Sequence, residues 1–433
     1  MQYATAGGRN VVAKCHHCIC SAPAQKRVLS TMTSLISWLD ASTEENSKMR
    51  ELVKLFGMPE TTDDLGMGQL RDAISNSLFP GTSVLHLGAR YMLLVPWAYH
   101  TAHRGTKNPE DLRKRAEESE RQLIGRFKEL GVESFIGGVA GMNVQQLPSA
   151  AYWSALRRYG IVNPETDRSA VAQLMCAETP SPEEGENAYY IWDPSLPKPP
   201  EGFPQSEENG LTLSHDEARW LQERILTTCA GTMLAHVVSS ATSPEPKSRA
   251  PWVDPACRNA EGEPAQWLQD AEAFSFIHYG ATILYQHLLA ELSGKTFSKE
   301  ADNLESTRDF LEAWEERRES KRELLANWDI EDYLGRAKTL NKGINSNTAD
   351  FAREMLRAAS SPSKLIDNAD FRAAVETREK LMKKSNSRFR NERRLRAWQP
   401  STQVASLTFR WAQVRRNVLD IHAGLALEGH ANA

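Results

Sequence analysis

The sequence lacks a long hydrophobic run, which excludes a protein that spans a membrane by α-helices. The most apolar stretch, residues 84–99, is interrupted by His86, Arg90 and Pro96 and is too short to cross a bilayer. The first thirty residues also lack the apolar core of a secretory signal. We therefore expect a soluble protein of the cytoplasm with no membrane partner.

Cysteine is scarce, with six residues in a chain of 433. Three lie far apart and are expected to be reduced thiols: Cys176, Cys229 and Cys257. The others belong to a Cys/His cluster near the N-terminus: Cys15, His16, His17, Cys18 and Cys20. Thiolate and imidazole suit tetrahedral zinc, but the second ligand pair that a structural zinc site needs does not follow. We therefore predict no metal.

Recognisable catalytic motifs are also missing. The sequence has no GxSxG elbow, HExxH helix, paired ExxH motif or dinucleotide-binding fingerprint. Gly294, Lys295 and Thr296 match the end of a phosphate-binding loop, but the first glycine of that motif would fall on Leu289, inside a predicted helix. We predict no cofactor and favour a protein that is not an enzyme. An active site assembled from scattered residues is the alternative.

The chain contains enough hydrophobic residues for a folded core, and its charges are unevenly distributed along the sequence. Hydrophobic residues make up 40% of the sequence and eleven residues are tryptophan, enough to offset the conformational entropy lost on folding. The net charge is −4, but residues 372–416 hold thirteen Lys and Arg against three Glu. That segment carries +10 and the remainder −14. Such a split indicates a cationic site for an anionic partner on an acidic body.

Apolar periodicity and capping signals predict a mainly α-helical protein with Pro-rich irregular connections. Capping boxes open two of the helices, at Ser42 with Glu45 and at Ser214 with Glu217. We expect Pro96 to kink or divide its helix, Ser149 to cap a short helix, and Gly294 to stop a long one. The predicted helices cover 42–56, 66–78, 84–103, 108–130, a short helix after 149, 214–233, 265–293, 303–327, 347–359, 371–398 and 404–425.

Composition suggests five segments. Residues 1–31 form an unstructured leader, and Met32, which precedes an amphipathic start, is an alternative point at which translation begins. Residues 32–178 form an N-terminal helical module, 179–213 a Pro-rich connection, 214–427 a C-terminal helical module, and 428–433 a tail. No repeat of fixed period is present.

The last quarter of the chain holds the clearest pattern. In the predicted helix 371–398, one face is apolar: Phe371, Val375, Met382 and Phe389. The opposite face is cationic: Arg372, Lys380, Lys383, Lys384, Arg390 and Arg394. The helix that follows has a hydrophobic seam: Val404, Leu407, Trp411, Val414, Val418, Ile421 and Leu425. Packing within a helical bundle is favoured over a coiled-coil dimer for this seam.

A second candidate lies in the N-terminal half. Tyr152, Trp153, Arg157 and Arg158 would suit a recognition helix that enters a DNA groove, in a small winged-helix-like part. Aromatic core residues followed by exposed arginines are the commoner arrangement, and we favour it.

These patterns favour a non-enzymatic protein that contacts DNA or RNA, or a component of an assembly, through the basic helix. The cations would contact phosphates, and Trp398 and Trp411 would stack a base. One alternative is a metal-dependent nuclease or other phosphodiesterase, which would require carboxylates converging near His100, His103 or Lys295. The other is a pure protein scaffold, in which acidic helices such as 303–327 would cover the basic helix.

Several segments resemble one bacterial family. They include SWLDAS, DLGMGQLRDAISNSLFPGTS, ARYMLLVPWAYH, LPSAAYWSALRRYGI, TREKLMKKSNSRFRNERRLRAWQ and LTFRWAQVRRNVLDIHAGL. On these segments the chain resembles domain-of-unknown-function family 6361 from about residue 32 to 427. The resemblance implies no reaction and no catalytic residue, and it suggests a phage-defence setting. Residues 86–88 and 137–146 are less basic than expected, which weakens an anion-binding role for those loops.

Two arginines stand in mainly apolar helical segments on either side of a Pro-Gly turn. They are Arg71 and Arg90, and a buried arginine requires a carboxylate, such as Asp64 or Asp72, or an anionic ligand. A structural salt bridge is the favoured interpretation.

Overall fold

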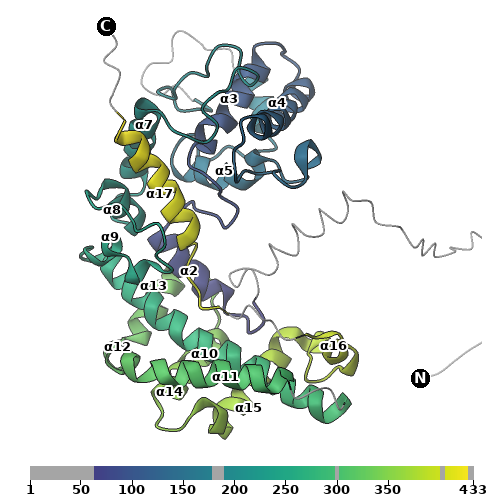
Figure 1. Cartoon of the computed structure of the whole chain (residues 1–433), viewed down its shortest axis with the longest axis vertical. Helices are drawn as coiled ribbons and strands as arrows, with labels where there is room; N and C mark the ends of the chain where they lie inside the picture. Colours follow the sequence, from purple (N-terminus) through teal and green to yellow (C-terminus); the bar gives the residue numbers. More distant parts are fainter. Residues whose placement is uncertain (1–62, 178–189, 298–301, 400–404, 428–433) are drawn as a thin grey trace, which may run out of the picture. The chain divides into compact units, whose positions relative to one another are not determined.

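The computed structural model describes residues 63–177, 190–297, 302–399 and 405–427, and these residues are mainly α-helical (Figure 1). Across those ranges no β-strand is formed, and the extended pairing is an isolated antiparallel bridge between Val162 and Trp192. The predicted fold class is therefore confirmed, whereas the winged-helix-like part is not. The leader 1–31, its Cys/His cluster and the helix predicted at 42–56 lie outside the described residues.

The connections between the helices vary in length, and α6 and α7 lie on either side of the Pro-rich segment. The α-helices are α2 (Gly68–Leu78), α3 (Tyr91–His103), α4 (Pro109–Glu129), α5 (Pro148–Arg158), α6 (Val171–Ala177), α7 (His215–Thr228), α8 (Met233–Ser239), α9 (Pro255–Arg258), α10 (Glu263–Phe297), α11 (Asp302–Arg318), α12 (Arg322–Asn327), α13 (Ile330–Leu340), α14 (Ser346–Ser360), α15 (Ala369–Lys383), α16 (Glu392–Ala397) and α17 (Trp411–Leu425). Short 3-10 helices are η1 (Gly141–Asn143), η2 (Pro251–Val253), η3 (Glu319–Lys321), η4 (Leu365–Asp367) and η5 (Lys384–Asn386).

The prediction for α2 is confirmed, but α3 begins later than expected. Residues 84–85 and 89–90 form turns, and the segment between them is irregular because the Tyr152 hydroxyl accepts from the backbone N–H groups of Leu87 and Gly88 and donates to the Gly88 carbonyl. Pro96 lies inside α3 and does not divide it. Nearly every residue of α3 is buried. Packing on all sides therefore compensates for the stability lost with the backbone hydrogen bond that Pro96 cannot make.

Helices α4 and α5 begin in different ways, and the cap predicted for α5 is wrong. Asn108 caps α4 by accepting from the backbone N–H groups of Glu110 and Asp111. In α5, Leu147 occupies the cap position and Ser149 is buried in the first turn. The backbone N–H of Ser149 donates instead to the Glu120 carboxyl of α4, at 2.7 Å. Tertiary contact has thus replaced the predicted local cap.

The capping box of Ser214 and Glu217 opens α7 as predicted. The helix ends at Thr228, earlier than expected, because Gly231 adopts a left-handed φ of 77° and Thr232 caps the separate helix α8.

The long helix α10 continues through Gly294 to Phe297, so the stop predicted at that glycine is wrong. Its partner is α11, and the two approach closely where Gly280 faces the Trp314 indole. A Cβ atom at Gly280 would lie 2.7 Å from that ring. The segment predicted as one helix, 303–327, is divided into α11 and α12 by η3, and α13 was not predicted.

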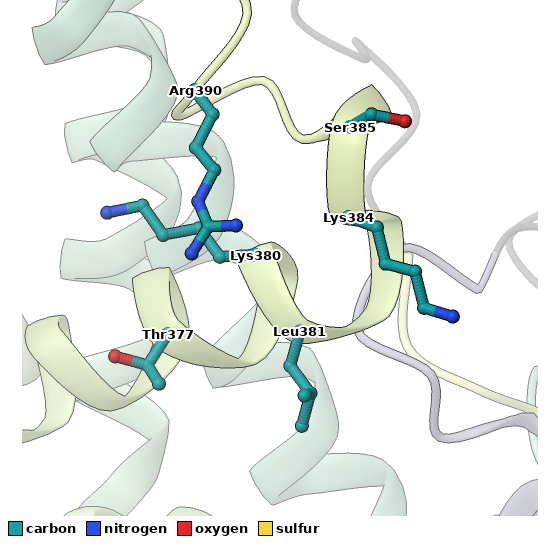
Figure 2. A pocket seen from close by; sticks show the side chains of 6 residues that line it. All are labelled: Thr377, Lys380, Leu381, Lys384, Ser385 and Arg390. Carbon is teal, nitrogen blue, oxygen red and sulfur yellow. The ribbon is translucent and has the colours of Figure 1, made fainter. Parts of the chain in front are cut away.

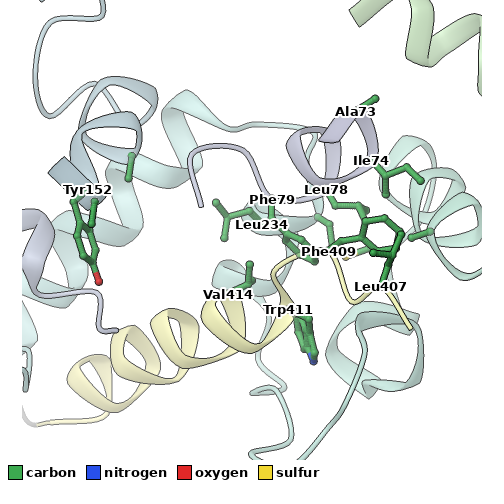
Figure 3. Close-up of a cluster of buried hydrophobic side chains, with 14 of the residues drawn as sticks. Ala73, Ile74, Leu78, Phe79, Tyr152, Leu234, Leu407, Phe409, Trp411 and Val414 are labelled. Atoms are coloured by element: carbon green, nitrogen blue, oxygen red, sulfur yellow. The ribbon is translucent and has the colours of Figure 1, made fainter. Parts of the chain in front are cut away.

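The C-terminal seam is covered within the chain. Helix α17 packs against α7 and α8, and Trp411, Val414, Val418 and Ile421 are buried. The helix starts only at Trp411, since Phe409 and Arg410 both have positive φ, yet Leu407 and Phe409 are still buried against α2 and its neighbours (Figure 3). This arrangement fits the favoured bundle interpretation. Val404 lies outside the described residues.

Contacts join segments on both sides of the predicted connection 179–213. The Tyr333 hydroxyl donates to the Leu70 carbonyl at 3.2 Å, and Arg90 binds Glu217 beyond the connection as well as Glu207 within it. The predicted module boundaries themselves stay a prediction.

Candidate functional site

The continuous basic helix predicted for 371–398 does not form. Helix α15 ends at Lys383, η5 follows, and α16 starts at Glu392. The cause is the buried carboxylate of Glu379, which accepts from the Ser387 hydroxyl at 2.5 Å and from the backbone N–H of Arg388 at 2.8 Å. These bonds draw the chain into a turn, in which Lys384 has a φ of 50°. The predicted single cationic face is therefore divided between two helices.

The apolar face is also interrupted. Phe371 and Val375 are buried as predicted, and Phe389 is partly buried. Met382 is 43% exposed, contrary to the prediction, and the neighbouring Leu381 is 50% exposed.

Three of the six predicted cations are compensated by carboxylates. Arg372 donates to Glu291 of α10 at 2.7 Å. Lys380 pairs with Glu376 one turn earlier, and Lys383 pairs with Asp64. These three side chains are about a quarter exposed. These cations form ion pairs within the fold and are also partly in contact with solvent.

Asp64 joins the start of the described chain to the end of α15. It is shared by Lys383 and Arg388, and the Arg388 guanidinium also donates to the Tyr285 hydroxyl at 2.5 Å. Burial opposes ionisation of Asp64, but Arg388 and Lys383 together hold its pKa below the usual value.

A second anchor is Arg378, which is buried without a carboxylate partner in the described part of the chain. It donates to the carbonyls of Leu65 and Gly66, at 2.8 Å each, and to the Thr348 hydroxyl at 3.0 Å. Burial among these neutral acceptors lowers the pKa of Arg378. Asp64 and Arg378 thereby hold the end of α15 in place.

Beyond these anchors the surface opens into a depression of about 780 Å³ (Figure 2). We call it the basic depression, and its lining residues are Thr377, Lys380, Leu381, Lys384, Ser385 and Arg390. Figure 2 shows Arg390 extending from the segment after η5 toward α15, where Lys380 lies. Three cationic side chains and two hydroxyls therefore border one open space.

The cations that follow are exposed. Lys384, Arg390 and Arg394 were predicted, and Arg393 and Arg396 were missed because they fall off the face of a continuous helix. Arg394 donates to the Asn386 side chain at 2.9 Å, and Arg396 stacks over the Phe297 ring at 4.8 Å. Within the described residues, none of these five cations forms an ion pair with a carboxylate.

The two tryptophans that were expected to stack a base lie in the interior. Trp398 is 8% exposed, and its indole N–H donates to Gln286 at 3.2 Å. Trp411 is fully buried, and its indole donates to the Ser248 hydroxyl at 2.9 Å. Neither ring presents a free face to a nucleobase.

Arg90 is the most completely buried charged group of the site candidates, with 0% exposure. Glu217 accepts from its guanidinium twice at 3.0 Å, and Glu207 accepts once at 2.6 Å. Burial opposes the charge, but the two carboxylates raise the pKa of Arg90. The salt-bridge interpretation holds, whereas the expected partners, Asp64 and Asp72, are wrong for this arginine.

Arg71 does form the expected local pair. Its Nε lies 3.1 Å from Asp72, whose carboxylate also lies 3.7 Å from Arg410. The pair is partly exposed and links α2 to the start of α17.

In the described residues, no group of three or more His, Cys, Asp or Glu side chains is arranged to hold a metal ion. His100 contacts the Trp192 ring, and burial together with Arg104 and His103 lowers its pKa to about 4. Lys295 is exposed and lies 3.9 Å from Glu291. Within the described ranges, no metal-binding group forms around His100, His103 or Lys295, and the nuclease alternative stays a prediction.

The fold and the basic depression together define a mainly helical protein with a cationic surface cluster. The chain belongs to a family of unknown function (DUF6361), whose model matches residues 33–424. No curated protein and no solved structure matches the chain. None of the described helices has the length and apolar character needed to span a membrane.

Proposed function

We propose that this protein is a non-enzymatic, cytoplasmic component that contacts DNA or RNA through the basic depression and the α16 cations, in the phage-defence setting that the family resemblance suggests. The observation that carries the proposal is the run of exposed cations Lys384, Arg390, Arg393, Arg394 and Arg396, which lack carboxylate partners within the described chain. The acid within that run is Glu392, which is also exposed. Such a cluster repels itself unless an anion approaches.

The chemistry of the depression favours the nucleic-acid backbone over the bases. Lysine and arginine bind phosphate oxygens, and the hydroxyls of Thr377 and Ser385 add neutral donors at the rim. Among the described residues, the lining contains no aromatic side chain, and Trp398 is buried. We therefore expect binding with little sequence preference.

The deciding experiment is binding of labelled DNA and RNA to the full chain across a salt series. Release of counterions by three phosphate contacts predicts a slope of roughly −2 to −3 in a plot of log affinity against log salt. A variant with Lys384, Arg390 and Arg394 changed to Gln should lose most of this slope.

The matched control changes three exposed cations elsewhere: Arg113, Lys114 and Arg219 to Gln. It alters the net charge by the same amount, so it separates a local contact from a general electrostatic effect. No binding at low salt, or equal losses in both variants, would refute the proposal.

A second candidate is assembly with an acidic protein partner. The observation in its favour is the pair of exposed apolar side chains, Leu381 and Met382, beside the cations. An interface needs apolar contact as well as charge. If Leu381→Ser abolishes association in cell extract while nucleic-acid binding is unchanged, the surface serves a protein.

A further inference from the structure

A second pocket lies far from the basic depression in sequence, between the end of α3 and the loop 190–199. Its volume is about 400 Å³, within the usual range of ~300–1,000 Å³ for small-molecule sites. The proposed function does not use it.

Contacts at both ends and in the middle join the loop to the rest of the fold, which favours a preformed pocket. The backbone bridge between Val162 and Trp192 fixes one end. The indole of Trp97 donates to the Pro197 carbonyl at 2.6 Å and fixes the other. Between them, Asp193 accepts from the backbone N–H of Ser195 at 2.8 Å and pairs with Arg224.

The inner surface of the pocket is aromatic and apolar. Trp192, against which His100 packs with ring centroids 5.9 Å apart, forms part of the floor. Tyr190 stands at the edge, 57% exposed, with its ring available to a ligand. Aromatic faces of this kind bind planar, conjugated groups by stacking.

The rim is cationic. Arg104 and Lys198 are exposed and, among the described residues, form no ion pair. The lining carboxylate, Asp193, is neutralised by Arg224. A ligand that fits both surfaces therefore has a planar ring and an anionic group.

We propose that this pocket binds a nucleotide, with the base over Tyr190 and the phosphate between Arg104 and Lys198. The nucleotide is either a free monophosphate or the terminal unit of a nucleic-acid strand. The inference is independent of phosphate contact at the basic depression.

The test is isothermal titration calorimetry of the full chain with AMP, adenosine and ribose 5-phosphate. AMP should bind at least about tenfold more tightly than either fragment, because only AMP uses both the ring and the cations. Tyr190→Ala and Arg104→Gln should each weaken AMP binding by about tenfold.

Two matched variants control for the fold. Tyr190→Phe keeps the ring and should bind AMP like the parent, and Arg113→Gln removes an exposed cation outside the pocket. No heat at millimolar AMP, equal binding of ribose 5-phosphate, or unchanged binding in both Tyr190→Ala and Arg104→Gln would overturn the proposal.

A second experiment distinguishes a free nucleotide from the end of a nucleic-acid strand as the ligand. In the variant with Lys384, Arg390 and Arg394 changed to Gln, a short 5′-phosphorylated oligonucleotide competes with AMP if strand ends are the ligand. If AMP binds and the oligonucleotide does not compete, the ligand is a free nucleotide. Loss of AMP binding in this variant would place AMP at the basic depression and refute the assignment.

Discussion

Arg90 and Arg390 carry the same guanidinium group in opposite environments. Arg90 is fully buried and is bound by two carboxylates from remote parts of the chain. Arg390 is exposed at the basic depression, where no carboxylate of the described chain pairs with it. A buried charge must be neutralised within the fold, whereas an exposed cluster can remain unbalanced until a partner neutralises it. Arg90 therefore stabilises the fold, whereas Arg390 is available to bind an anionic partner.

The strongest test of the buried side is Arg90→Met, which leaves Glu207 and Glu217 without their cation. We expect the free energy of unfolding to fall by about 3–5 kcal/mol. Urea denaturation followed by circular dichroism measures the loss. Arg219→Met, on the exposed face of α7, should change stability by less than about 1 kcal/mol. Similar losses of stability in both variants would show that the buried ion pairs of Arg90 contribute no more than an exposed one.

Glu120 tests burial of a carboxyl group that forms no ion pair within the described residues. Burial raises the pKa of Glu120 to about 7 from an ordinary 4.5, although the backbone N–H of Ser149 opposes the shift. The folded state thus holds this proton more tightly than the unfolded state. The stability it contributes is complete below pH 4.5 and is lost as the pH rises through 7.

Glu120→Gln should therefore be more stable than the parent above pH 7, by roughly 1–3 kcal/mol. The advantage should shrink toward zero near pH 4.5. Thermal denaturation at several pH values checks this, with Glu118→Gln, an exposed neighbour, as the control. A difference between Glu120→Gln and the parent that does not vary with pH would contradict the burial argument.

Glu379 connects the two sides of the comparison, because a buried acid shapes the exposed site. Glu379→Ala should cost about 2 kcal/mol in stability by leaving the Ser387 and Arg388 donors unpaired. It should also weaken nucleic-acid binding, although it removes a negative charge. Glu392→Ala removes the same charge at an exposed position and should strengthen binding slightly. Stronger binding in both variants would show that charge alone matters.

Substitution of the exposed cations should have the smallest effect on stability. Changing Lys384, Arg390 and Arg394 to Gln should alter the free energy of unfolding by less than about 0.5 kcal/mol. The same denaturation assay measures this. A decrease of several kcal/mol in the free energy of unfolding would show that these cations stabilise the fold and are not available to bind a partner.

Local signals predicted the helices well and the candidate site less well. The pair Ser214 and Glu217 caps its helix as expected, since this cap depends on residues three positions apart. The break after Lys383 was missed because it depends on bonds from Glu379 to residues eight and nine positions away. Lys380, Lys384 and Arg390 were identified from the sequence, but Arg393, Arg396 and the grouping around one depression were not.

The helical class, the position of most helices and the excess of positive charge near the C-terminus can be read from the amino-acid sequence, because periodicity, capping and composition act over short distances. Which charges are available for binding depends on the folded arrangement. It placed Glu207 and Glu217 against Arg90, 117 and 127 positions away, and buried Trp398 against Gln286. Burying a polar group is unfavourable unless a partner forms a hydrogen bond or ion pair with it. The folded arrangement supplies that partner, and the spacing of residues along the chain does not identify it.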